Sequence, residues 1–217
     1  MSEMMQPNLR IPISEDFFCD GKFYVLTSTS LGGSELTTKE LSTILGDGQP
    51  TQIEALLQQG ICIPLFFEAD CELDRETLFV IGDLTPEEAN GWIGRLRAKL
   101  HIPCGKLVFL CGGGDAEELA KAISGQPPQP DYQIFQVIDL PAGDYLVEVY
   151  AYLSSAVVQN YLEQQEKTVE AWFMDHCPDV VGQGYIIRLS PLDAEPPLPR
   201  LVPEVGWCGE FEFRQPE

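Results

Sequence analysis

The most unusual chemical feature of this sequence is a stretch without acidic residues. The chain carries 34 Asp and Glu residues against 13 Lys and Arg residues, yet residues 89–114 contain no carboxylate. Basic groups gather in this stretch, namely Arg95, Arg97, Lys99, His101 and Lys106. They could bind an anionic ligand, or they could pair with the protein's own carboxylates while their alkyl stems cover apolar surface. The sequence therefore predicts a candidate anion-binding site here, with internal ion pairing as the alternative.

The element expected to position these groups is a helix that begins after Thr85. Thr85 can cap this helix, Pro86 suits its first position, and Glu88 completes a capping box. Apolar residues continue at helical spacing and form one stripe, which consists of Ala89, Trp92, Ile93, Leu96 and Leu100. The pattern predicts a helix that extends to about residue 100.

Three small residues fall on the opposite side of this predicted helix. Gly91 and Gly94 lie three positions apart, next to Asn90. Each glycine inside a helix costs roughly 1 kcal/mol relative to alanine. Small residues at this spacing let another backbone approach closely. We therefore expect the face formed by Asn90, Gly91 and Gly94 to be covered, by the chain itself or a second subunit rather than by a substrate.

Other groups of residues match the motifs of phosphate-binding, zinc-binding or catalytic sites poorly. Residues 112–114 are three glycines, but Asp115, Glu117 and Glu118 follow where a phosphate loop would carry Lys and Ser or Thr. The two histidines, His101 and His176, have no C-x₂₋₄-C pair beside them to complete a zinc site. Cysteine catalysis would require folding to bring a histidine near a distant thiol. We expect no metal and no cofactor, and the sequence identifies no catalytic residue.

The remaining pattern predicts an α+β protein. Short apolar runs separated by turn residues predict an antiparallel, β-rich sheet or sandwich of about eight or nine strands, with four or five packed helices. No sustained β-α-β-α alternation is present. We expect a single domain over residues 1–217. The three prolines between residues 127 and 130 offer a possible division into 1–125 and 131–217.

Several individual elements can also be predicted. Asp20-Gly21 between apolar runs predicts a hairpin that joins residues 17–19 to 23–26. The apolar run 61–67 should start after Pro64 or lie at a sheet edge, because proline cannot donate to a β ladder. Residues 132–138 and 145–152 should be strands joined by a loop. A long helix is expected from about Val158 to His176, with His176 on its apolar stripe.

Composition narrows the possible partners and the compartment. A formal net charge of −21 repels phosphate backbones and anionic lipid, so we expect neither nucleic-acid nor membrane binding. The chain has no long apolar run, and its first 13 residues do not resemble a secretory signal. Seven cysteines, most of them in apolar runs, predict buried free thiols and a cytoplasmic location.

These observations favour a noncatalytic binding or protein-interaction module. The acidity could steer a basic protein partner, and an immunity-type inhibitor of a basic toxin or nuclease is one concrete form. Self-association is a further possibility, as is a structural subunit whose proline-rich segment, residues 191–203, packs on a neighbour. The competing hypothesis is an enzyme, a hydrolase or transferase acting on an anionic small molecule near residues 89–114.

Overall fold

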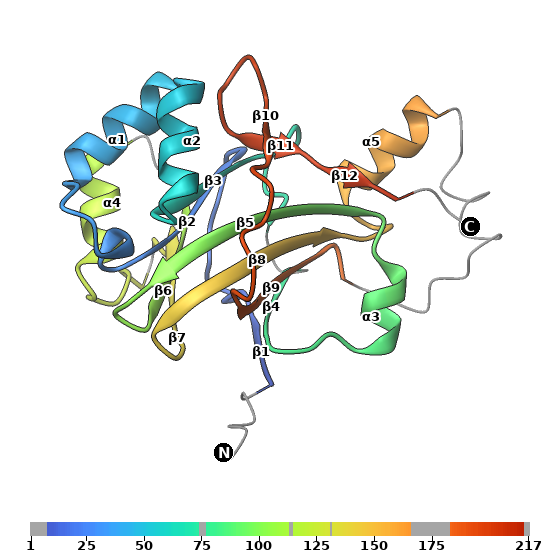
Figure 1. Ribbon diagram of the computed structural model, residues 1–217, viewed down its shortest axis with the longest axis horizontal. Coiled ribbons are helices and arrows are strands. Elements are labelled where there is room, and N and C mark those ends of the chain that lie inside the picture. The colour runs from blue at the N-terminus through green and yellow to red at the C-terminus, as the bar shows by residue number, and fades with distance from the viewer. Residues whose placement is uncertain (1–7, 74–76, 113–114, 131, 166–182, 215–217) are drawn as a thin grey trace.

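The computed structural model describes residues 8–73, 77–112, 115–130, 132–165 and 183–214 of the 217-residue chain. Within these ranges the chain forms five α-helices and two six-stranded sheets (Figure 1). The first sheet has the order β1 (Leu9–Pro12), β4 (Thr77–Ile81), β9 (Tyr185–Pro191), β8 (Gly143–Ala151), β5 (Gly94–Ile102), β12 (Glu212–Phe213). The second has the order β10 (Arg200–Leu201), β11 (Cys208–Glu210), β3 (Cys62–Phe66), β2 (Phe23–Ser28), β6 (Lys106–Cys111), β7 (Phe135–Asp139).

The predicted α+β, β-rich class is confirmed. The described residues contain twelve strands rather than eight or nine, and both sheets are mixed. The β4–β9 and β11–β3 pairs are parallel, whereas the other pairs are antiparallel. Strands on both sides of the proline-rich segment 127–130 pair with each other, β6 with β7 and β5 with β8. The division of the chain into domains stays a prediction.

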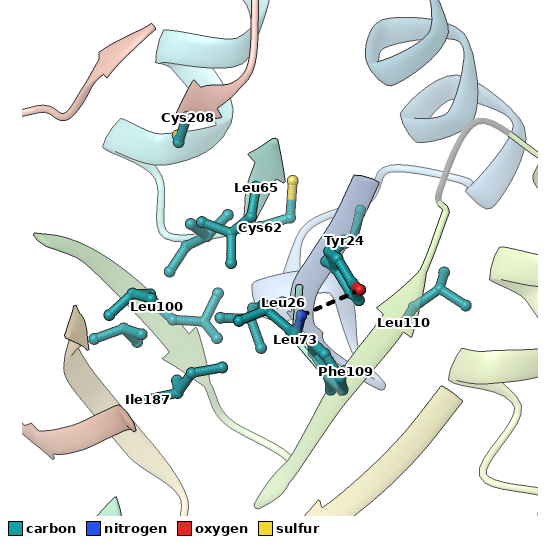
Figure 2. Close-up of a cluster of buried hydrophobic side chains, with 14 of the residues drawn as sticks. Tyr24, Leu26, Cys62, Leu65, Leu73, Leu100, Phe109, Leu110, Ile187 and Cys208 are labelled. Carbon is teal, nitrogen blue, oxygen red and sulfur yellow. Dashed lines mark hydrogen bonds between the residues drawn. The ribbon is translucent and has the colours of Figure 1, made fainter. Parts of the chain in front are cut away.

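The main core lies between the two sheets (Figure 2). Tyr24 and Phe109 of the second sheet stack with ring centroids 5.5 Å apart, and Phe79 of the first sheet meets Phe109 edge-on at 5.5 Å. Leu100 and Ile187 of the first sheet also point into this space. Residues on both faces of β2 and β6 are buried, which explains why the apolar residues 23–26 and 107–111 form continuous runs rather than alternating ones.

The helices take two places around the sheets (Figure 1). Helices α1 (Thr38–Asp47), α2 (Pro50–Gln58) and α4 (Ala116–Ile123) gather beside the second sheet. Helices α3 (Pro86–Gly91) and α5 (Ala156–Gln164) lie beside the first. The predicted cap at Thr85 is present as a capping box, Thr37 forms another, and Asp115 caps α4. None of the helices within the described ranges combines the length and apolarity needed to cross a membrane.

The predicted helix over residues 85–100 is wrong in its second half. Helix α3 ends at Gly91, Trp92 is already extended, and β5 begins at Gly94. From Gly94 to Ile102 the chain alternates between buried and partly exposed residues. That alternation has the period of a strand with one buried face. A strand therefore forms where a helix was expected.

Two further expectations also need correction. Phe17 makes only an isolated bridge with Gln133, so no hairpin forms at Asp20-Gly21. Strand β3 begins before Pro64 and lies inside its sheet, between β11 and β2, with Pro64 opposite Val25. The predicted strands 132–138 and 145–152 are present as β7 and β8, which a loop joins, although they belong to different sheets. Helix α5 begins at Ala156, and the predicted helical residues 166–176 lie outside the described part.

The expectation that the cysteines are all free thiols is wrong for two of them. Cys19 and Cys111 form a disulfide, with Cα atoms 5.5 Å apart, a normal spacing for such a bond. The disulfide does not include Cys62 and Cys208, which are buried, or Cys71 and Cys104, which are exposed. A cytoplasmic location stays a prediction.

Candidate functional site

The predicted basic residues of β5 lie side by side on the outward face of the first sheet. Because side chains alternate along a strand, Arg95, Arg97, Lys99 and His101 all point away from the core, while Leu96 and its equivalents point into it. The neighbouring strand β8 places Glu148 opposite Arg97 and Asp144 opposite His101. On β8, Asp144 pairs with His101 directly across the strands, and Glu148 lies diagonally within 3.8 Å of Arg95.

Each of the five predicted basic residues, including Lys106 of β6, pairs with a carboxylate of the same chain. The ion pairs are Arg95 with Glu212 at 3.3 Å, Arg97 with Glu212 at 3.1 Å, Lys99 with Glu195 at 2.8 Å, Lys106 with Asp139 at 2.7 Å, and His101 with Asp144. Arg95 also lies 3.8 Å from the buried carboxylate of Glu148. The structure thus contains the internal pairing that was the alternative to an anion site. The anion site itself stays a prediction, and we do not place the function there.

Lowering the pH is expected to remove the stabilisation that Glu212 provides. Burial alone would raise the pKa of Glu212, but hydrogen bonds and charge from Arg97 and Arg95 outweigh it and hold that pKa below its usual value. Such a carboxyl stabilises the fold above its unfolded-state pKa, and this contribution disappears as pH falls through the folded-state pKa. Glu212→Gln should therefore lower the free energy of unfolding at pH 7 by about 0.2–1 kcal/mol per exposed pair lost.

Urea denaturation of the wild type and Glu212→Gln at several pH values measures this effect. The two proteins should differ at neutral pH and converge in acid, where Glu212 is protonated. An equal difference at every pH would contradict the assignment of the stabilisation to these ion pairs.

The three small residues of the predicted covered face do not share an element. Asn90 and Gly91 end helix α3, and Asn90 is exposed. Gly94 begins β5 and is buried, and a Cβ atom at this position would lie 3.2 Å from the Phe213 ring and 3.3 Å from the Ala151 methyl. Close approach therefore occurs at Gly94, where other parts of the same chain pack against it.

The described histidine and cysteine side chains do not form a catalytic arrangement. His101 hydrogen-bonds through Nδ1 to Asp144. The Cys104 sulfur contacts the Thr29 hydroxyl at 3.1 Å and the Lys106 carbonyl at 3.7 Å. Burial opposes ionisation of Cys104, but hydrogen bonds, chiefly with Ser30 and Thr29, lower its pKa to about 7. His176 lies outside the described residues, and no group of three or more metal-ligating side chains occurs within them.

A separate cleft of about 360 Å³ is lined by residues of helix α5, strands β11 and β12, and the turn 68–73 that follows β3. Three carboxylates line it, Glu68 and Glu72 from the turn and Glu210 from β11. The described residues that line the cleft include no Lys, Arg or His. We call this feature the acidic cleft. Its lining favours a positively charged ligand.

Aromatic side chains form much of the remaining wall. Tyr161 of α5 stacks on Phe213 of β12, with parallel rings and centroids 3.9 Å apart. Phe67 and Phe211, whose centroids lie 6.1 Å apart, and Phe66 complete this part of the lining. Aromatic faces carry negative electrostatic potential and attract cations that lie over them. The walls and the carboxylates therefore favour the same class of ligand.

Two hydrogen bonds position the carboxylates of the turn. Asn160 of α5 donates from Nδ2 to Glu68 at 3.0 Å, which ties the turn to the helix across the cleft. The Tyr185 hydroxyl donates to Glu72. Burial raises the pKa of Tyr185, and the charge of Glu72 beside it raises that pKa further. Tyr185 thus stays protonated and keeps donating to Glu72 at neutral pH.

Sequence reasoning did not find the acidic cleft. Its residues come from four segments, 66–72, 156–164, 202 and 209–213, which only the folded sheets bring together. One signal was available. Aromatic residues and acids alternate near the C-terminus, as in Glu210, Phe211, Glu212 and Phe213.

The comparisons with known proteins give two distant structural likenesses. A solved structure described as crocagin biosynthetic gene J has 14% identity and a TM-score of 0.42, covering 87% of this chain and 99% of that one. ComJ from Bacillus subtilis, described as an inhibitor of the DNA-degrading activity of NucA, has 9% identity and a TM-score of 0.34, covering 86% of this chain and 96% of that one. No family model and no curated protein matches the sequence. At TM-scores below 0.5, neither likeness supports a functional argument.

Proposed function

We propose that this protein is a noncatalytic binding protein whose acidic cleft receives cationic side chains of a basic protein partner. The observation that carries the proposal is the lining of the cleft. Three carboxylates and several aromatic faces meet there, and the described lining contains no cation. A guanidinium suits such a site because it can hydrogen-bond to carboxylates and stack on aromatic rings at the same time.

The charge of the whole molecule supports a basic partner. The net charge is −21, and the basic groups of residues 89–114 are already matched by carboxylates of the same chain. The electrostatic potential around the protein is therefore negative, and it accelerates the approach of a positively charged surface. A second copy of this chain would bring an equally acidic surface to the cleft, so self-association there is disfavoured. An immunity-type inhibitor of a basic toxin or nuclease is a concrete form of this proposal.

The test measures binding of a fluorescein-labelled hexa-arginine peptide by fluorescence anisotropy at two salt concentrations. A hexa-citrulline peptide keeps the shape of the probe without its charge. We expect the arginine peptide to bind, to weaken as salt rises because exposed charges are screened, and to bind more tightly than the citrulline peptide. If the arginine peptide does not bind even at low salt, the proposed function is wrong.

A pair of variants locates the binding. Glu68→Gln with Glu210→Gln removes two carboxylates from the cleft, and affinity for the arginine peptide should fall by about tenfold, the equivalent of two modest ion pairs. Glu35→Gln with Glu54→Gln makes the same change in net charge at exposed positions away from the cleft. This control should bind almost as the wild type does. Equal losses in the two variants would mean that the cleft is not the site.

A further inference from the structure

Three cysteines meet where the turn 68–73 packs against residues 19–21. The Cys71 thiol donates to the backbone carbonyl of Cys19, with the sulfur 2.6 Å from the oxygen. The Cys71 backbone N–H donates to the Gly21 carbonyl at 3.2 Å. Cys19 is itself bonded to Cys111 at the end of β6. The exposed Cys71 thiol therefore lies against one of the two residues that form the disulfide.

The backbone at Cys71 is unusual as well. Its φ of +60° lies in the left-handed region, which side chains other than glycine rarely adopt. Such a conformation persists only where the surrounding structure holds it, and it is often found at functional positions. Here the hydrogen bonds to Cys19 and Gly21 hold the turn against the disulfide.

We propose that Cys71, Cys19 and Cys111 form an internal thiol–disulfide exchange site. The Cys71 thiolate attacks the Cys19 sulfur, a Cys71–Cys19 bond forms, and the Cys19–Cys111 bond breaks. The electron pair of the broken bond leaves with the Cys111 sulfur, which takes up the proton that Cys71 lost. One disulfide and one thiol are present before and after the step, so no external oxidant or reductant is consumed.

The turn that carries Cys71 also supplies Glu68 and Glu72 to the acidic cleft. Its far end is fixed, because Leu73 is fully buried and its N–H donates to the Tyr24 hydroxyl at 3.3 Å (Figure 2). A new bond at Cys71 must therefore be accommodated within residues 68–72, which moves the two carboxylates. The exchange would thus regulate the cleft, and this second step rests on the proposed function, whereas the exchange itself does not.

Disulfide mapping tests the exchange. The wild type is held at pH 8, quenched with acid, alkylated with N-ethylmaleimide and digested without reduction. Trypsin with a glutamate-specific protease separates Cys62 from Cys71 by cleavage at Glu68. Both Cys19–Cys111 and Cys19–Cys71 peptides are expected in the wild type, and only the first in Cys71→Ser. A wild type that yields Cys19–Cys111 alone overturns the proposal.

Cys111→Ser provides an independent reading of the same site. With Cys111 removed, oxidised glutathione should drive formation of a Cys19–Cys71 bond. Cys104 is a matched control because it is also exposed and outside the disulfide but lies elsewhere, against Thr29. We expect the Cys19–Cys71 product to exceed Cys19–Cys104 by at least about tenfold, since proximity decides which thiol reacts. Equal amounts of the two products would count against the site.

Regulation of the cleft is read separately, through the affinity of the hexa-arginine peptide. Oxidised Cys111→Ser, which holds the Cys19–Cys71 bond, should differ from Cys71→Ser by threefold or more. Equal affinities with both linkages mapped would leave the exchange site in place and overturn its control of the cleft. If none of these proteins binds the peptide, the proposed function is wrong, but the result of the disulfide mapping still stands.

Discussion

Replacing Phe109 with alanine is expected to lower the free energy of unfolding by about 3–5 kcal/mol, the range for loss of a large aromatic side chain from a core. Phe109 is fully buried between the sheets and its ring meets three others, those of Phe17 at 4.9 Å, Tyr24 at 5.5 Å and Phe79 at 5.5 Å. Removing it takes away the contact that joins β6 of one sheet to β4 of the other. Urea denaturation followed by tryptophan fluorescence measures the change.

Phe18 offers a control of the same residue type. It is 50% exposed, and its nearest aromatic neighbour is Tyr132, with ring centroids 6.4 Å apart. Phe18→Ala should change stability by no more than about 0.5 kcal/mol, as is usual at the surface. Similar losses in the two variants would show that Phe109 does not hold the sheets together.

Helices that begin with a capping residue could be recognised from the sequence. Thr85 caps α3 as predicted from its side-chain chemistry, and Thr37 and Asp115 cap α1 and α4 in the same way. A cap acts within four residues, so the sequence contains all that is needed to predict it. The same local signal explains the error that followed Thr85. The predicted helix began correctly but was continued past Gly91, although apolar and basic residues alternate from Arg95 onward with the period of a strand.

The ion pairs, the acidic cleft and the disulfide depend on contacts between residues that are far apart in the sequence. The basic groups of β5 were recognised, but their pairing with Glu212 and Glu195 joins residues about a hundred positions apart. The acidic cleft depends on such contacts even more, because Asn160 and Glu68 are 92 positions apart. The disulfide likewise links Cys19 to Cys111 across 92 positions, and its pairing cannot be deduced from spacing alone.

Gly206→Ala is expected to destabilise the protein by about 2–5 kcal/mol, the sum of left-handed backbone strain and overpacking. Gly206 has φ +68°, and a Cβ atom there would lie 1.9 Å from the Gly48 carbonyl oxygen. The Gly48 backbone cannot easily move away. It ends α1 in a left-handed conformation, and a Cβ on Gly48 would itself meet the Val205 carbonyl at 2.5 Å. Trp207, which donates from Nε1 to the Leu45 carbonyl at 2.9 Å, fixes the two segments together.

Gly125→Ala separates the two contributions. Gly125 has nearly the same φ, +74°, but nothing outside its own chain neighbours lies within 4 Å of the position that its Cβ would occupy. Its substitution should cost only the strain of a left-handed alanine, about 1–2 kcal/mol. The difference between the two variants in thermal or urea denaturation then measures the contact between residues 48 and 206. If both variants lose the same stability, the two backbones have room to separate, and the close contact contributes nothing to holding Gly206 beside Gly48.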